Sequence, residues 1–238
     1  MKTVVAATAL ATIFFLAPYY PLHARTTDNA VKAIKQGDFE KALNELRPLV
    51  QKNDPNAQFL MGMLYDAGHG VPQDHAIAAS WYRKAAEQTH PTAQLFLGIL
   101  YYSGNGVDQD YKQAAHWFQA PAHNGNDQAQ FYLGSMYARG AGVSKDDSQA
   151  IEWLRKAAAQ KHTRAMGMLA TLLFSRNQNE QDLIDAYVWS HLAAEYDPVQ
   201  ATTSARILIA KYCNEAQIKA AKKSIAEWKR KWKNAPTT

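Results

Sequence analysis

The chain has 238 residues, of which 47% are hydrophobic and 20% charged, and its formal net charge is +5. This composition is typical of a folded domain and excludes a largely disordered, collagen-like or disulfide-rich chain. Cys213 is the single cysteine, so no internal disulfide can form. We interpret it as a small, buried apolar side chain rather than a reactive thiol.

Residues 1–24 have the layout of a secretory signal peptide. Lys2 is their only charged residue, an apolar run follows it, and Ala24 offers a small side chain at the expected cleavage point. A membrane span needs about 18 or more apolar residues, and Pro18 ends this run too early. We therefore expect export through the secretory route, to the bacterial periplasm or outside the cell, with Arg25 as the first mature residue.

Beyond this segment the chain repeats itself every 36 residues. Tryptophans, aspartates, alanines, tyrosines and glycines all recur in phase with this step, which is too regular to arise by chance. A period of this length indicates a stack of helical repeats. The clearest series are Trp81/Trp117/Trp153/Trp189, Asp74/Asp110/Asp146/Asp182, Ala57/Ala93/Ala129/Ala165/Ala201, Tyr65/Tyr101/Tyr137, Gly62/Gly98/Gly134 and Gly68/Gly104/Gly140.

Each recurring residue type has a structural role that identifies two helices per repeat. Ala57 and Tyr65 fall on one face of a first helix, and Gly62 beside them lets a second helix approach closely. Gly68 then ends the first helix, because glycine adopts the left-handed conformation without a clash. Asp74 is placed to cap the second helix. The pattern predicts an all-α protein, a right-handed α-solenoid of antiparallel helix pairs with a 36-residue period.

The repeated segment "AQFLMGMLYDAGHGVPQDHAIAASWYRKAAEQ" begins at Ala57, and further copies begin at Ala93 and Ala129. It resembles the Sel-one-like repeat (SLR) family, a relative of the tetratricopeptide repeats. The N-terminal layout, the resemblance and the sequence period together predict the following organisation: a signal peptide at 1–24, an N-terminal incomplete repeat at 25–56, three full repeats at 57–164, a degenerate fourth repeat at 165–200, and C-terminal capping helices with a basic tail at 201–238.

No catalytic or metal-binding motif is found in the sequence. Zinc-site spacings, a P-loop and a serine nucleophile elbow are absent, and no serine is followed three residues later by lysine. The eight histidines are dispersed in the sequence. This favours histidines that lie at the surface, or whose ring nitrogens are hydrogen-bonded within the fold, over a metal site. Some cysteine-rich members of the family resembled here are associated with β-lactam binding or hydrolysis, but they carry a disulfide in each repeat. We therefore predict that the chain is not an enzyme and has no cofactor; a cell-envelope hydrolase acting on a β-lactam or peptidoglycan is the alternative.

The tetratricopeptide likeness implies that the first helices line a concave groove. The side chains expected there are unusually apolar and aromatic, as is typical of an interaction site. Tight winding of the repeats could instead bury part of this stripe. We assign partner binding to Phe59, Leu60, Met63, Leu95, Phe96, Ile99, Tyr102, Phe131, Tyr132, Ser135, Arg139 and Phe174.

These observations favour an exported scaffold or adaptor that holds a peptide or a partner domain in the groove. We expect no nucleic acid and no small-molecule substrate. The segment 206–233 contains nine basic and two acidic residues, so an anionic membrane surface is a further candidate partner. In that alternative the protein is a membrane-surface tether, and a solvated basic face is the plainer interpretation of the same charges. The contacts would come from Lys229, Arg230, Lys231 and Lys233.

Overall fold

The computed structural model describes residues 27–176, 179–197 and 209–234, and within these ranges it contains helices and no strands. The predicted signal peptide, residues 1–24, lies outside the described residues. The helices are α2 (Asp28–Lys35), α3 (Phe39–Gln51), α4 (Pro55–Ala67), α5 (His75–Glu87), α6 (Pro91–Ser103), α7 (Tyr111–His123), α8 (Asp127–Arg139), α9 (Asp147–Ala159), α10 (Thr163–Arg176), α11 (Glu180–Tyr196) and α13 (Glu215–Lys233).

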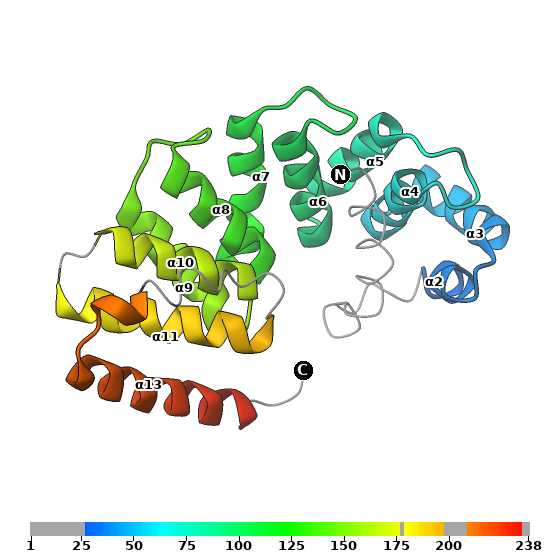
Figure 1. The fold of residues 1–238 in the computed structure, drawn as a ribbon. Helices are drawn as coiled ribbons and strands as arrows, with labels where there is room; N and C mark the ends of the chain where they lie inside the picture. Colours follow the sequence, from blue (N-terminus) through cyan, green and yellow to red (C-terminus); the bar gives the residue numbers. More distant parts are fainter. Residues whose placement is uncertain (1–26, 177–178, 198–208, 235–238) are drawn as a thin grey trace. The chain divides into compact units, whose positions relative to one another are not determined.

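The helices keep the 36-residue period of the sequence. The first helices of the three full repeats, α4, α6 and α8, begin 36 residues apart, and so do the second helices α5, α7 and α9. Helices that follow one another in the sequence pack side by side as pairs (Figure 1). The contacts between α4 and α5 and between α8 and α9 are extensive. The predicted all-α fold of helix pairs is confirmed.

Side chains and glycines at the helix ends explain why the boundaries repeat. Asp74 accepts hydrogen bonds from the N–H groups of Ala76 and Ile77, both at 2.9 Å, and so caps α5. Asp110 and Asp146 cap the next two second helices in the same way. Gly68 ends α4 with φ of 71°, in the left-handed region where other residues are strained.

A glycine in each full repeat sets the distance between its two helices, as predicted. A Cβ atom on Gly62 would lie 2.6 Å from the Tyr82 ring, and one on Gly98 would lie 2.7 Å from the Phe118 ring. At Gly134 the nearest atoms include backbone: the added carbon would be 2.8 Å from Leu154 Cγ and 3.1 Å from Leu154 N. The glycines are therefore required by close packing.

Contacts divide the chain into two units, Met1–Ala120 and Pro121–Thr238, and the division falls within α7. The first unit has its own core, in which Phe59, Tyr82 and Phe118 are among the largest fully buried side chains. The second unit has a separate core built from α8 to α11 and α13. The predicted repeat boundaries are finer than this division.

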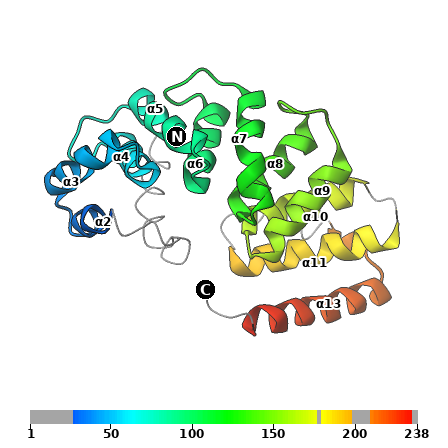
Figure 2. The same cartoon turned by 180° about the vertical axis from the view of Figure 1, so that it is seen from behind.

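In the second unit, α13 lies beside α11 in both views (Figures 1 and 2). Trp228 packs against Trp189 with ring centroids 5.0 Å apart. The indole N–H of Trp232 donates a hydrogen bond to the carbonyl of Ala159 at 2.7 Å, and Trp232 is buried. Trp228 and Trp232 of this basic helix therefore pack into the core of the unit.

The fourth repeat closes without the glycine loop. Asp182 continues the aspartate series, but its carboxylate binds Arg176 through two hydrogen bonds, Nε to Oδ2 at 3.0 Å and Nη2 to Oδ1 at 2.8 Å. The pKa of Arg176 is raised, chiefly by these hydrogen bonds. Asn179 takes over the capping role, because its side chain accepts a hydrogen bond from the Asp182 N–H at 2.9 Å. An ion pair with two hydrogen bonds holds this connection.

Candidate partner-binding surfaces

Half of the side chains that sequence analysis assigned to partner binding are buried within their units. A partner at the surface cannot contact these side chains without rearrangement of the core, so they contribute packing instead. The buried residues are Phe59, Leu60, Met63, Leu95, Phe131 and Ser135.

Histidine rings account for part of this burial. His90 stacks on Phe59 with ring centroids 4.8 Å apart, and His162 stacks on Phe131 at the same distance. Each histidine also caps the following helix: the Nδ1 atom of His90 accepts a hydrogen bond from the Ala93 N–H at 3.1 Å. Burial lowers the pKa of His90 to about 4, and it also lowers the pKa of His162. Both rings are therefore neutral acceptors at neutral pH.

The other predicted residues keep exposed surface and fall on separate helices of the two units. In the first unit Phe96, Ile99 and Tyr102 lie along α6, and all three are partly exposed. Phe96 rests on the Phe59 and Tyr82 rings at centroid distances of 5.8 and 5.4 Å. Phe96 is therefore supported from below by a packed aromatic core.

In the second unit the accessible predicted residues are Tyr132 and Arg139 on α8 and Phe174 on α10. Tyr132 is partly exposed and contacts Phe131, with ring centroids 5.5 Å apart. Phe174 packs edge to face against Tyr212 at 5.4 Å. Aromatic and arginine side chains are the commonest anchors of protein interfaces.

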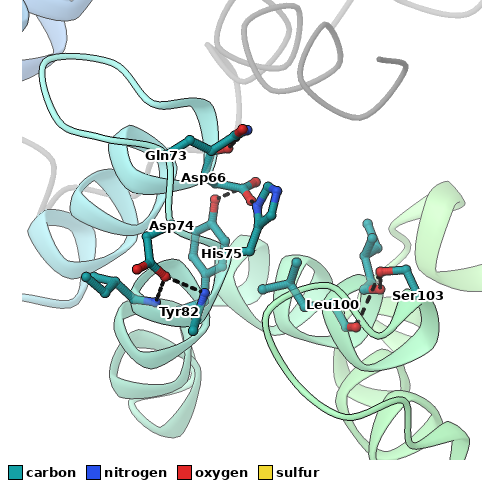
Figure 3. A network of polar contacts seen from close by, with 10 residues as sticks. Asp66, Gln73, Asp74, His75, Tyr82, Leu100 and Ser103 are labelled. Carbon is teal, nitrogen blue, oxygen red and sulfur yellow. Dashed lines mark hydrogen bonds and ion pairs between the residues drawn. The ribbon is translucent and has the colours of Figure 1, made fainter. Parts of the chain in front are cut away.

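A buried carboxylate network, which sequence analysis did not identify, joins α4 to α5 (Figure 3). Asp66 is only 5% exposed, and its Oδ1 atom lies 2.7 Å from the Nδ1 atom of His75. Its Oδ2 atom accepts a hydrogen bond from the Tyr82 hydroxyl at 3.5 Å, and Gln73 donates to the Asp66 carbonyl at 2.8 Å. The pKa of Tyr82 is raised, first by burial and then by the Asp66 carboxylate.

This network is confined to the first full repeat. Residues 36 positions after Asp66, His75 and Tyr82 are Tyr102, Tyr111 and Phe118, so the equivalent place in the next repeat is aromatic. The break in period at Asp66, which stands where the other copies have Tyr102, Ala138 and Phe174, was the sequence feature that could have revealed it. Its contacts support a local role in fixing α5 against α4.

A cavity of about 580 Å³ opens in the first unit. It is bounded by α5, the end of α6, the following loop and α7. The guanidinium of Arg83 donates a hydrogen bond to the Tyr101 hydroxyl within it. Its lining residues are Arg83, Glu87, Tyr101, Val107, Asp108, Asp110, Gln113 and Trp117.

The remaining candidates identified from the sequence give little sign of a reactive site. The pKa of the Cys213 thiol is raised by burial, which is the opposite of what activates a thiol. Among residues 27–176, 179–197 and 209–234, no group of three or more histidine, cysteine or acidic side chains is arranged to hold a metal ion. Within the same ranges, no helix is long and apolar enough to cross a membrane.

The basic side chains of α13 are partly engaged within the second unit. Lys229 pairs with Glu195 at 2.6 Å, and the Lys231 ammonium lies 4.8 Å from the centroid of the Trp228 ring. Arg230 and Lys233 are exposed. Because Trp228 and Trp232 pack inward, they are not available as the aromatic anchors that a membrane-surface helix uses.

Comparison with known proteins identifies the repeat. A scan against protein families matches the Sel1 repeat to residues 55–90, 91–126 and 127–162. Among solved structures, a protective antigen of uropathogenic Escherichia coli with an SLR fold is 29% identical, with a TM-score of 0.74 over 90% of this chain and 50% of that one. A Sel1 repeat protein from Oxalobacter formigenes is 27% identical, with a TM-score of 0.68 over 89% of this chain and 86% of that one. This chain thus spans about half the length of the E. coli antigen. A search of curated proteins finds no match.

Proposed function

We propose that the protein is an exported scaffold that binds a segment of another protein on its first helices, because residues 55–162 match three consecutive Sel1 repeats. Sel1 repeat proteins are typically scaffolds for protein interactions. The observation that carries the proposal is the set of partly exposed aromatic side chains on these helices, supported by a packed core.

The surface on α6 is the stronger of the two candidates. Phe96, Ile99 and Tyr102 are three residues apart, so they follow one side of the helix over two turns. Phe96 is fixed from below by Phe59 and Tyr82. Such side chains lose little conformational freedom on binding, which favours affinity. A partner would place apolar side chains along this row.

The surface on α8 of the second unit adds a charged group. Tyr132 supplies a partly exposed ring, and Arg139 at the end of the same helix is exposed. An arginine can bind a carboxylate through two parallel hydrogen bonds. We propose that a partner segment on this surface carries an acidic residue or a chain terminus opposite Arg139.

Site-specific crosslinking tests the proposal directly. A photoreactive amino acid replaces Tyr102 on α6 in the full chain, and a matched control replaces Lys112, which is exposed on the second helix α7. We expect one partner to be captured from position 102 and not from position 112.

Affinity measurements with the captured partner complete the test. Phe96→Ala and Tyr102→Ala should each weaken binding by about 5- to 150-fold if they are anchors, with the helical circular dichroism unchanged. Equal crosslinking from both positions, or unchanged affinity in both variants, contradicts the assignment.

A further inference from the structure

Among the tryptophans of the three full repeats, Trp117 differs from Trp81 and Trp153 because no described lysine of its own helix covers its ring. The ammonium of Lys84 lies 4.2 Å from the centroid of the Trp81 ring, and that of Lys156 lies 4.2 Å from the Trp153 ring. Each lysine is three residues after its tryptophan, one turn along the second helix. The residue three positions after Trp117 is Ala120, which is exposed and carries no charge.

The cavity described above borders this tryptophan. Trp117 is partly exposed and forms part of the wall, together with Tyr101 and Val107. Its indole nitrogen is buried and has no hydrogen-bond partner among the described residues. The cavity therefore presents the surface of a tryptophan that, unlike Trp81 and Trp153, has no lysine ammonium over its ring among the described residues.

Carboxylates gather at the same place. Glu87, Asp108 and Asp110 line the cavity, whereas Arg83 is its single cationic side chain, so the lining carries a net charge of −2. Arg83 is held on the Tyr101 hydroxyl and lies with its guanidinium 5.8 Å from the centroid of that ring.

Two of these acids are absent from the sibling repeats. The residues 36 positions before and after Glu87 are Gln51 and His123, and those before and after Asp108 are Pro72 and Ser144. Asp110 belongs to the repeated capping series and is present in all three copies. The cavity beside Trp117 thus contains two carboxylates that sibling positions lack, Glu87 from the first full repeat and Asp108 from the second.

We propose that this cavity binds a lysine side chain supplied by a partner protein. The ammonium group lies over the Trp117 ring, as those of Lys84 and Lys156 lie over theirs, and Glu87 and Asp108 balance its charge. A cation within about 6 Å of an indole centroid is attracted by the ring, and the attraction grows when water is displaced. The biological partner rests on the proposed function, but the lining of this cavity does not include Phe96, Ile99 or Tyr102 of the surface proposed above.

A small-molecule titration tests the site without any partner. The probe is Nα-acetyl-lysine N-methylamide, added to the full chain while the indole N–H resonance of Trp117 is followed by NMR; Trp117→Phe identifies the resonance. We expect a saturable shift at millimolar concentrations that weakens with added salt. The same compound with its ε-amine acetylated, which is neutral, should produce no saturable shift.

Matched variants then decide whether the lysine position is the one inferred. Ala120→Lys restores the covering lysine within the chain and should abolish the response to the probe, whereas Ala120→Gln has a long neutral side chain and should retain it. Replacing both acids, Glu87→Gln with Asp108→Asn, should weaken probe binding by about 2- to 20-fold. An equal shift with the acetylated compound, the absence of a saturable shift, or an undiminished response in both Ala120→Lys and the double acid variant overturns the proposal. None of these outcomes depends on whether α6 binds a partner.

Discussion

Replacing His90 with asparagine should make the first unit less sensitive to acid. The Nδ1 atom of His90 accepts the hydrogen bond that caps α6, so the ring must be neutral there. Asparagine can fill the same role, since Asn126 caps α8 by accepting a hydrogen bond from the Ala129 N–H at 2.8 Å. The variant therefore keeps an acceptor at the helix start and removes the group that titrates.

The magnitude follows from the difference in pKa between the folded and unfolded states. The pKa of His90 is lowered from 6.5 to about 4, mainly by burial. The folded state thus binds fewer protons between these values, so its stability is fully present above about pH 6.5 and falls as the pH drops toward 4. Within this window the free energy of unfolding falls by about 1.4 kcal/mol for each pH unit. The folded state therefore loses about 2 kcal/mol of stability between pH 7 and pH 5.

Urea unfolding of the two proteins at pH 7, 6 and 5 measures this loss. The wild type should lose about 2 kcal/mol more than His90→Asn across the range. At pH 7 the variant should be the less stable, because it lacks the ring that stacks on Phe59. NMR of the wild type gives a second readout, in which the His90 ring stays neutral down to about pH 5. Parallel pH dependences of the two proteins, or a His90 that titrates near 6.5, would refute the reasoning.

Three further predictions concern packing, export and catalysis. Gly134→Val should destabilise the second unit by about 3 kcal/mol, because a Cβ would meet backbone atoms at 3.1 and 3.2 Å; an unchanged melting temperature would contradict this. Sequencing of the mature protein should find Arg25 at its N-terminus, whereas an intact Met1 on membrane-bound material would exclude cleavage. Purified protein should not hydrolyse a chromogenic β-lactam above a heat-treated control, and a rate proportional to protein concentration would favour the hydrolase alternative.

The periodic residues allowed the helices to be predicted, because each acts within its own repeat. Asp74 caps the helix that follows it, and Gly62 faces a residue 20 positions later, so a sequence period carries this information. The exposure of a side chain could not be predicted in this way, because it depends on neighbouring residues that vary between repeats. Phe59 is buried partly because His90, where the next repeat has Asn126, can stack on it.

The Asp66 network and the cavity at Trp117 depart from the period and therefore could not be deduced from it. Asp66 stands where the other copies have Tyr102, Ala138 and Phe174, and its partner His75 lies nine residues away across a loop whose path the sequence does not reveal. The absence of a lysine at Ala120 becomes informative only once Lys84 is seen over Trp81. In a repeat protein the irregular positions are the ones for which a structure is most needed.

The tight contacts at the glycines have a consequence for how such a chain can change its length. Gly62 meets Tyr82, and Gly134 meets Leu154, so each glycine and its bulky neighbour are inherited together within one 36-residue segment. The contact between segments at Gly106 is with the backbone of His75 and Ala76, which is the same whatever side chains stand there. Duplication or deletion of a whole segment, cut just before a proline such as Pro91, would leave both kinds of contact intact. Lengthening the array by recombination should therefore be tolerated far better than exchanging one helix of a pair.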